Sequence, residues 1–263
     1  MTTQESPRPD VDPEIAALWR EVLLHGHPGR WSFLPSEPRC MVCRQPFEGV
    51  GGRALRMFTG YKPSRTTPNL CNTCEDLMPP GGAEVDVAVL FADMRGSTAI
   101  GARLGSADYA ALVNRFYEAT SHVLVTHESW IDKLVGDEIM ALYIPAMGPD
   151  YRGRAVEAGA ALLRAFGYNP SETAWLKVGV GISAGPAFVG KVGAKGSQQV
   201  TALGDTVNVA ARIQAQAAPG ELLMSEDLYQ SVAQKYPGLE RRSLAAKGRE
   251  EPVEVRVLRP AEL

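Results

Sequence analysis

Apolar and polar positions after residue 82 follow the periods of alternating strands and helices. Val85 to Ala92 is an almost continuous apolar run, with its odd-numbered residues on one face, and predicts a buried central strand. The same patterns predict helices over 106–127, 152–166 and 204–217, strand pairs over 130–135 with 138–144 and over 178–183 with 187–192, and a closing strand over 254–258. The order strand, helix, strand, strand, helix, strand is that of a ferredoxin-like α+β fold, here extended at its C-terminal end.

The first 82 residues follow no such order. Asp12 and Pro13 predict the start of a short helix, which the segment 25–29 ends. A stretch rich in glycine, proline and arginine follows, and the run 78–82, with two prolines and two glycines, predicts a linker. We therefore expect two domains, residues 1–82 and residues 83–263.

The composition is that of a globular protein. The 263 residues are 45% hydrophobic and carry 27 basic and 30 acidic side chains, a net charge of −3 that falls entirely on residues 83–263. This balance excludes a disordered chain and disfavours a protein devoted to nucleic acid. The first ten residues lack the apolar segment of a signal peptide, and no uncharged apolar run approaches the roughly 18 residues of a membrane span. We expect a cytoplasmic protein without membrane contact.

All four cysteines are crowded into one segment, as the pairs Cys40-x2-Cys43 and Cys71-x2-Cys74, which 27 residues separate. Paired knuckles of this kind predict a tetrahedral four-thiolate site for structural zinc, with iron or an iron–sulfur cluster as the alternative. Disulfides fit a cytosolic protein less well. Six basic residues and one acid lie over 39–65. We interpret them as a solvated face with a regulatory or dimer-supporting role rather than a nucleic-acid contact.

Two carboxylates stand at strand ends. Asp93 ends the buried strand, and Asp137 lies in the turn of the first strand pair. Two such carboxylates on neighbouring strands are a template for binding Mg²⁺, although each also suits a plain cap or turn. After Asp93 comes a strand-to-helix turn with Gly96, Ser97 and Thr98, whose backbone N–H groups can hold phosphate.

Strand alternation places Lys133 on the face of Ile131 and Val135, where a solvated lysine is unexpected, unless its side chain snorkels from an edge strand. A surface lysine would more naturally share the face of Asp132.

In the predicted helix over 204–217, Asp205 is the expected N-cap. Asn208 and Arg212 then lie four residues apart on one helical face. An amide and a guanidinium so placed can bind one developing phosphate charge, or they form an ordinary surface pair.

Four segments, in this order and spacing, resemble the catalytic domain of class III nucleotidyl cyclases, specifically the adenylyl cyclases: VLFADMRGST, KLVGDEIM, VGVGISAGPAFVGKVG and TALGDTVNVAAR. The resemblance covers about residues 84–258. It implies an enzyme that converts ATP to 3′,5′-cyclic AMP and pyrophosphate by attack of the ribose 3′-OH on the α-phosphate, with two Mg²⁺ or Mn²⁺ ions in each active site.

The resemblance also implies roles for single residues. Asp93 and Asp137 match the two metal-binding aspartates of the family. Asn208 and Arg212 match the pair that stabilises the transition state, and Lys247 matches a lysine that holds the terminal phosphates.

Lys133 and Thr201 match the pair that reads the purine. In the family, lysine accompanies adenine, whereas guanylyl cyclases carry glutamate and cysteine there. A threonine at the position of Thr201 is typical of a bacterial and bicarbonate-responsive branch, so bicarbonate activation is a hypothesis. The phosphate turn departs from many members at Ser97, where they carry phenylalanine.

In this family, the aspartates and the Lys, Thr, Asn and Arg set come from opposite sides of a head-to-tail dimer. One chain that carries both halves implies a homodimer with two equivalent sites. Three alternatives stay open: a guanylyl cyclase, a diguanylate cyclase, and a non-catalytic domain that binds nucleotide for regulation. The diguanylate cyclase is considered because Gly-Asp-Glu at 136–138 resembles part of the signature of that class. The N-terminal segment is also a candidate site for a partner protein.

Overall fold

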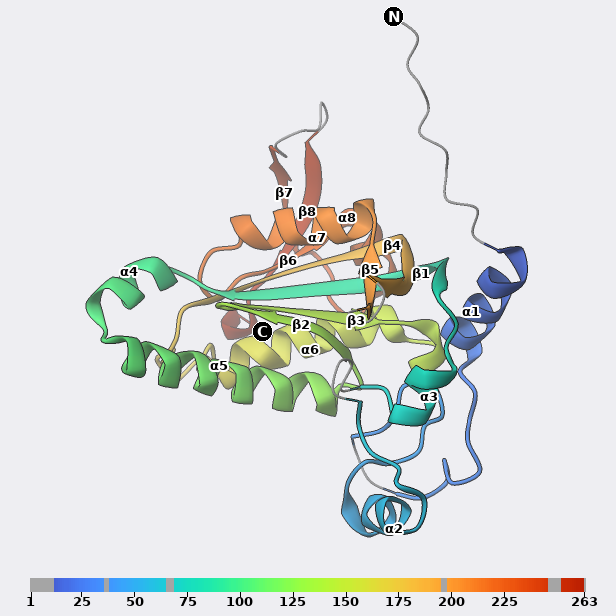
Figure 1. Ribbon diagram of the computed structural model, residues 1–263. Coiled ribbons are helices and arrows are strands. Elements are labelled where there is room, and N and C mark those ends of the chain that lie inside the picture. The colour runs from blue at the N-terminus through green and yellow to red at the C-terminus, as the bar shows by residue number, and fades with distance from the viewer. Residues whose placement is uncertain (1–11, 36–37, 65–68, 195–197, 246–251, 263) are drawn as a thin grey trace, which may run out of the picture.

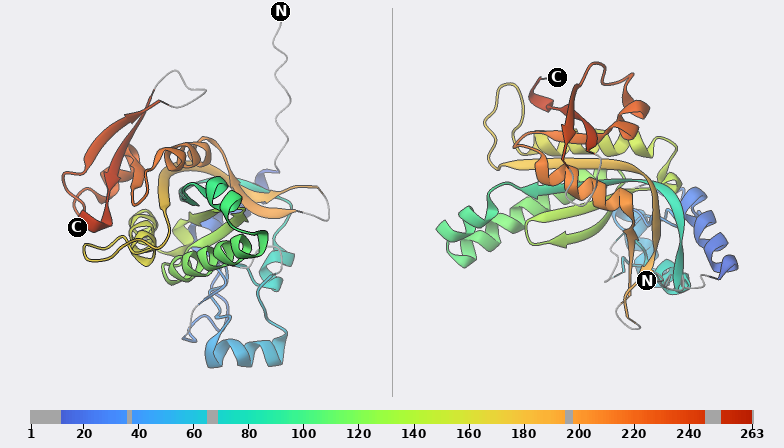
Figure 2. Two further views of the ribbon diagram at one scale, coloured as in Figure 1. Left: turned by 90° about the vertical axis from the view of Figure 1, so that its left-hand side faces the viewer. Right: turned by 90° about the horizontal axis from the view of Figure 1, so that it is seen from above.

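A computed structural model of the protein describes residues 12–35, 38–64, 69–194, 198–245 and 252–262 (Figures 1 and 2). Its helices are α1 (Pro13–His25), α2 (Gly49–Thr59), α3 (Asn72–Leu77), α4 (Ser97–Arg103), α5 (Ser106–Thr126), α6 (Tyr151–Ala165), α7 (Asp205–Gln216) and α8 (Glu226–Val232). Its strands are β1 (Gly81–Met94), β2 (Trp130–Val135), β3 (Glu138–Tyr143), β4 (Val178–Val192), β5 (Gln199–Leu203), β6 (Leu222–Ser225), β7 (Glu240–Leu244) and β8 (Val253–Leu258). Short 3₁₀ turns are η1 (Pro145–Met147) and η2 (Pro260–Glu262).

Within the described residues, the strands form one eight-stranded sheet in the order β2-β3-β1-β4-β6-β8-β7, with β5 paired to β4. The part from β1 to β4 has the ferredoxin-like arrangement that the sequence predicted, with α5 and α6 on one face of the sheet (Figure 1). The sequence predicted the C-terminal extension only as added elements. The structure shows it as β5, β6, α8 and β7 around the predicted helix α7 and strand β8.

The long ladder between β1 and β4 corrects two predictions. The expected linker ends in Gly81 and Gly82, yet both belong to β1 and pair with β4. Gly82 and Gly190 face each other so closely that a Cβ on Gly82 would lie 2.6 Å from the Cα of Gly190. These glycines therefore allow the backbones of β1 and β4 to approach closely inside the sheet. The linker prediction is wrong for residues 81 and 82.

The strand pair predicted over 178–183 and 187–192 is also wrong, because β4 runs unbroken from Val178 to Val192 through Gly185 and Pro186. Pro186 lies opposite Asp86 of β1. On its other side, β4 pairs with β6 only over 180–182 and with β5 only over 188–192. Among the described strands, Pro186 thus has a neighbour on one side only, which is where a sheet tolerates proline.

The two faces of the sheet bury separate cores. The even-numbered residues of β1, such as Leu90, pack under α5, α6 and α8. The odd-numbered residues, such as Val87 and Val89, pack against α7 and also against Trp19 and Leu23 of α1. The N-terminal segment therefore continues the core of the sheet, while the division of the chain at residue 82 stays a prediction.

Two helix starts test the capping predictions. Asp12 accepts a hydrogen bond from the backbone N–H of Glu14 at 2.9 Å, and Pro13 opens α1, as predicted. In α7, however, Gly204 occupies the capping position with a φ of 140°, and Asp205 is the first helical residue. The chain turns from β5 into α7 through a backbone conformation that favours glycine, so the prediction of Asp205 as the N-cap is wrong.

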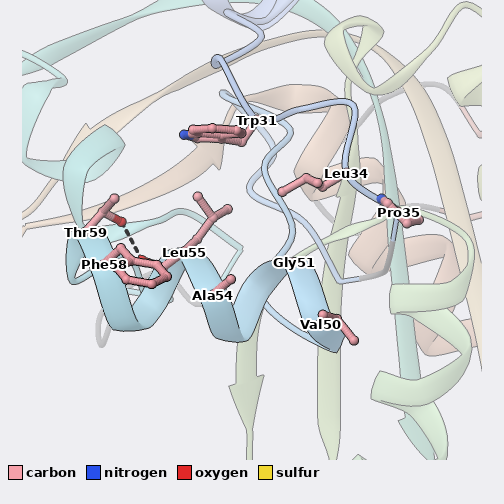
Figure 3. Close-up of a pocket in the computed structure, with 9 residues that line it drawn as sticks. All are labelled: Trp31, Leu34, Pro35, Val50, Gly51, Ala54, Leu55, Phe58 and Thr59. Atoms are coloured by element: carbon pink, nitrogen blue, oxygen red, sulfur yellow. Dashed lines mark hydrogen bonds between the residues drawn. The ribbon is translucent and has the colours of Figure 1, made fainter.

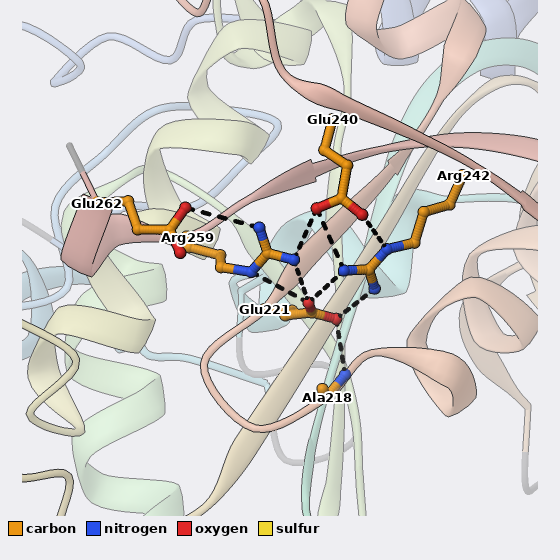
Figure 4. Close-up of polar contacts among 6 residues, drawn as sticks. All are labelled: Ala218, Glu221, Glu240, Arg242, Arg259 and Glu262. Carbon is orange, nitrogen blue, oxygen red and sulfur yellow. Dashed lines mark hydrogen bonds and ion pairs between the residues drawn. The ribbon is translucent and has the colours of Figure 1, made fainter.

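The C-terminal strands are joined by an ion-pair network (Figure 4). The carboxylate of Glu221, 7% exposed, accepts hydrogen bonds from Arg242 of β7 at 2.7 and 2.9 Å and from Arg259 at 2.7 Å. Burial alone would raise the pKa of Glu221, but these hydrogen bonds and one from the N–H of Ala218 lower it to about 2. The network fixes β7 and β8 beside β6.

Among the described residues, no helix combines the length and the apolar character needed to span a bilayer.

Candidate active site and cysteine cluster

The predicted carboxylates meet at one end of the sheet. Asp93 lies at the end of β1, opposite Glu138 of β3, and Asp137 lies in the turn between β2 and β3. Two hydrogen bonds hold this turn in place. The N–H of Met94 donates to the carbonyl of Asp137 at 3.1 Å, and the hydroxyl of Tyr117 donates to the carbonyl of Gly136 at 2.7 Å. The positions of both aspartates are therefore set by the backbone.

Negative charge at this end of the sheet is only partly neutralised. Burial and the nearby charge of Asp137 raise the pKa of Asp93 to about 6. Burial, followed by the charge of Asp137, also raises the pKa of Glu138. Carboxylates that crowd each other in this way are stabilised by a divalent cation, which takes oxygen ligands from one or two such groups. The donor set present therefore fits Mg²⁺ or Mn²⁺.

Arg95 is a neighbour of these carboxylates that the sequence did not reveal as part of the site. Its Nη1 lies 3.4 Å from Oδ2 of Asp93, and its Nη2 donates to the carbonyl of Gln214 in α7. Its Nε is buried and makes no hydrogen bond to any described residue. Burial lowers the pKa of this guanidinium. The only sequence signal for this role was its place two residues after Asp93.

The predicted phosphate turn lies beside Asp93. Gly96 adopts a left-handed conformation with a φ of 75° and precedes α4, which begins at Ser97. Ser97 is half-buried and Thr98 is exposed. The turn is thus open to solvent on the side where Asp93 ends β1.

Lys133 and Thr201, the predicted purine pair, are brought together by a third residue. The hydroxyl of Thr201 in β5 donates to Oδ2 of Asp132 at 2.7 Å, and Nζ of Lys133 lies 3.8 Å from the same oxygen. The side chain of Asp132 is 1% exposed, and that of Lys133 is 41% exposed. The sequence assigned Asp132 to the surface, so its burial is a correction.

A β-bulge causes that difference. The pairing of β2 with β3 shifts between Ile131, opposite Ala141, and Lys133, opposite Met140. Strict alternation therefore fails at Asp132, and Lys133 does not share a face with Ile131 as predicted. It shares the face of Met140, which packs with the odd-numbered residues of β1. Lys133 thus lies on the same face of the sheet as Asp93.

Asn208 and Arg212 lie one turn apart on α7, as predicted. Asn208 is exposed and Arg212 is half-buried. Within the described part of the chain, neither side chain makes a hydrogen bond or an ion pair, so the structure does not join them to Asp93 or Asp137 of the same chain. Lys247 lies outside the described residues.

The four cysteines form the cluster that their spacing predicted. Their sulfur atoms all lie within 4.8 Å of one another, and Cys40, Cys43 and Cys71 are buried. The N–H groups of Cys71 and Cys74 donate to the sulfurs of Cys40 and Cys71 at 3.3 and 3.2 Å. Backbone donors of this kind stabilise thiolates and orient metal ligands. The described residues could therefore hold one tetrahedral ion.

Proton sharing within the cluster is uneven. Hydrogen bonding with Cys40 lowers the pKa of the Cys43 thiol, while hydrogen bonding with Cys43 raises the pKa of Cys40. Four adjacent thiolates repel one another, so full ionisation requires a cation among them. The chemistry of the donor set fits zinc or iron.

Ion pairs and hydrogen bonds join the cysteine cluster to the sheet. Arg44, directly after Cys43, pairs with Glu128, which also binds Arg154 of α6 at 2.6 Å. The side chain of Asn69 donates to the carbonyl of Ser129 at 2.9 Å. These contacts fix the segment that leads into β2, the strand of Asp132 and Lys133.

An apolar hollow of about 480 Å³ lies between α2 and the segment 31–35 (Figure 3). Val50 and Phe58, which line it, are 80% and 83% exposed. No ionisable side chain lines this hollow, and α2 is remote from the end of β1 that carries Asp93 (Figure 1). It is therefore separate from the carboxylate site.

Comparison with known proteins establishes the family of the chain. The family model described as "Adenylate and Guanylate cyclase catalytic domain" matches residues 82–258, and the chain belongs to this family. The uncharacterized protein Rv1319c of Mycobacterium tuberculosis (strain ATCC 25618 / H37Rv) is 31% identical over 157 residues, which are 59% of this chain and 29% of that protein. The chain thus spans less than a third of the length of the curated relatives it matches.

Solved structures show the same fold. The adenylyl cyclase CyaB from P. aeruginosa is 26% identical, with a TM-score of 0.59 over 67% of this chain and 95% of that chain. The guanylyl cyclase Cya2 is 24% identical, with a TM-score of 0.62 over 67% of this chain and 93% of that chain. Adenylyl and guanylyl cyclases therefore both occur among similar folds, and the family match establishes a nucleotide cyclase domain without choosing the base.

Proposed function

We propose that this chain is an adenylyl cyclase of the cytoplasm that converts ATP to 3′,5′-cyclic AMP and pyrophosphate at sites shared across a homodimer. The observation that carries the proposal is the crowded pair Asp93 and Asp137 at the end of β1, in a chain of the cyclase family. Half-buried like charges at a strand end cost stability and are characteristic of sites that bind and react.

Asp93 and Asp137 would hold the divalent ions. When bound, these ions supply Lewis-acid chemistry that lowers the pKa of the ribose 3′-OH and neutralises the triphosphate. Asn208 orients the ribose, and Arg212 and Lys247 offset the charge that develops on the phosphates as pyrophosphate leaves. The N–H groups of the turn at Gly96–Thr98 bind phosphate oxygens.

Arg212 and Asn208 make no polar contact in the described single chain, and this supports the dimer. In a head-to-tail pair, the α7 side chains of one protomer face the carboxylates of its partner. A complementation experiment tests this. Asp93→Ala and Asn208→Ala are each expected to be inactive, whereas their mixture regains activity because one intact site forms in each heterodimer. A mixture as inactive as its parents contradicts shared sites.

The direct test is incubation of the purified chain with ATP or GTP and Mn²⁺ or Mg²⁺, with identification of the product. Cyclic AMP from ATP is the expected result. Cyclic GMP as the main product favours the guanylyl alternative, and binding without turnover favours a regulatory domain. Addition of bicarbonate to the same assay shows whether it activates the enzyme.

We also propose that the cysteine cluster holds a structural zinc ion. The support is the closed, buried grouping of four sulfurs with backbone donors. Metal analysis of the purified protein is expected to find about one zinc per chain and much less in Cys71→Ser. Stoichiometric iron overturns the choice of zinc, and absence of metal overturns the site.

A further inference from the structure

Asp132 is a buried carboxylate that neither the metal nor the phosphate chemistry uses. Its side chain is 1% exposed. Oδ2 accepts the hydroxyl hydrogen of Thr201 at 2.7 Å, and Oδ1 makes no hydrogen bond to any described residue. The nearest cation, Nζ of Lys133, lies 3.8 Å away. Burying a carboxylate with so little compensation is costly, and such a group is usually retained for function.

The hydrogen bond from Thr201 has a consequence for recognition. A hydroxyl has one hydrogen to donate and two lone pairs to accept with. Because the hydrogen of Thr201 goes to Asp132, only lone pairs are left for a ligand. A carboxylate cannot return a hydrogen, so while Asp132 is ionised the direction of this bond is fixed.

We propose that Asp132 is a positioning residue that makes the Thr201 hydroxyl an acceptor only, and thereby selects a purine with a 6-amino group over one with a 6-oxo group. The inference rests on the proposed function, in which Lys133 and Thr201 read the base. It extends that function by naming the group that chooses between ATP and GTP. Thr201 alone does not make this choice, because the hydroxyl of a threonine can either donate or accept.

The two bases differ at the required atom. The exocyclic N6 of adenine is a donor, whereas O6 of guanine is an acceptor. An acceptor-only Thr201 pairs with N6 and repels O6. The ammonium of Lys133 is a donor only, so it complements the ring nitrogen N1 of adenine, which accepts. Donor and acceptor side by side thus match the adenine edge.

The fold holds this arrangement rigidly. The bulge between Ile131 and Lys133 turns Asp132 inward, and Thr201 is fixed in β5 opposite Gly190 of β4. Thr201 is 5% exposed, so water competes little for its hydroxyl. The hydrogen bond between Asp132 and Thr201 is therefore set before the nucleotide arrives.

Asp132→Asn tests the inference with little change of shape. The amide can donate to the oxygen of Thr201, which frees the hydroxyl hydrogen to point at the purine. The ratio of kcat/KM for ATP to that for GTP is expected to fall about tenfold or more, mainly because GTP improves. The matched control is Asp86→Asn, which removes an ion pair to Arg152 that, among the described residues, shares no hydrogen bond or ion pair with Asp132, Lys133 or Thr201, and it leaves the ratio unchanged. A purely structural role of Asp132 would lower both activities together.

Thr201→Val serves as a second variant if Asp132→Asn does not fold. It removes the acceptor and keeps the volume, so kcat/KM for ATP falls about tenfold while that for GTP changes less than about threefold.

Equilibrium binding of ATP and GTP with Mn²⁺ measures the same preference without turnover. If the wild type binds ATP preferentially but forms no cyclic nucleotide, the proposed function fails and this inference is still decided by the variants. A ratio unchanged in both variants, or a wild type that prefers GTP, overturns the inference.

Discussion

Two acidic side chains at strand ends of the same sheet, Glu221 directly before β6 and Asp93 at the end of β1, lie in opposite electrostatic environments. Glu221 receives hydrogen bonds from Arg242 and Arg259, and its pKa falls to about 2. Asp93 has one arginine contact at 3.4 Å and a second carboxylate beside it, and its pKa rises to about 6. Both residues are acids next to an arginine, so the number and geometry of the partners decide the direction of the shift.

The difference separates a structural carboxylate from a functional one. Around Glu221 every charge has a partner within the protein, and nothing is left to attract a ligand (Figure 4). Around Asp93 the negative charge exceeds what Arg95 supplies, which leaves the site ready for a cation and unfavourable without one. The four predictions below test this contrast, from the largest expected effect to the smallest.

Removal of the Asp93 charge is expected to separate activity from stability. Asp93→Asn should lower turnover roughly 10³-fold or more, because a ligand of the divalent ions is lost. The free energy of unfolding without added metal should not fall, since the variant relieves repulsion from Asp137. Cyclic nucleotide assays and chemical denaturation measure the two quantities. A variant that loses both activity and stability would show that Asp93 is a structural residue like Glu221.

Removal of either of the two polar α7 side chains, Arg212 or Asn208, is expected to have the next largest effect. Arg212→Ala and Asn208→Ala should each lower turnover about 10²–10³-fold, which corresponds to roughly 2.7–4 kcal/mol of transition-state stabilisation. Neither side chain has a polar partner in the described chain, so the melting temperature should stay within about 2 °C of the wild type. Near-normal rates would remove α7 from the active site.

The sequence predicted those parts of the fold that local patterns determine. The apolar run of β1, the hairpin of β2 and β3, and the cap of α1 at Asp12 need no distant partner to be recognised. The unbroken strand β4 could not be predicted, because Gly185 and Pro186 are turn residues by local rules. Their neighbours in β1 hold them in the sheet.

The candidate site shows the same limit. The aspartates and the cysteine pairs are recognisable by motif and spacing, and the structure brings each set together. Arg95 and Asp132 have roles that only tertiary contacts define. The bulge at Asp132 changes the face that period-two alternation gave to Lys133, and one such irregularity is invisible in the pattern.

Glu221→Gln tests the structural side of the comparison. It should destabilise the fold by about 2–3 kcal/mol, because Arg242 and Arg259 lose a charged acceptor in a largely buried position. The activity of the folded protein should be unchanged. Glu254→Gln, which removes the more exposed pair with Arg241, is the matched control and should cost less than about 0.5 kcal/mol. Equal losses in both variants would show that burial of the network does not matter.

The pH dependence of stability gives the smallest effect and the most direct contrast. The folded-state pKa of Asp93, about 6, exceeds its ordinary value of 3.8, so the folded protein binds this proton more tightly than the unfolded chain. The penalty of the Asp93 charge is therefore present above pH 6 and disappears as the pH falls towards 4. Glu221 behaves in the opposite way: its contribution is complete above pH 4.5 and is lost only as the pH falls towards 2.

Of Asp93 and Glu221, only Asp93 titrates between pH 6 and pH 4.5 in the folded protein. The pKa of Asp132, also raised to about 6 by burial, shifts the wild-type curve in the same direction. Subtraction of the Asp93→Asn curve from that of the wild type, both measured by denaturation in a chelator, isolates the Asp93 contribution. The variant should be more stable by about 1 kcal/mol at pH 7, after allowance for solvent screening, and the difference should vanish near pH 4. Parallel curves over this window would mean that Asp93 is as well compensated as Glu221, and the electrostatic case for a cation at this end of β1 would be lost.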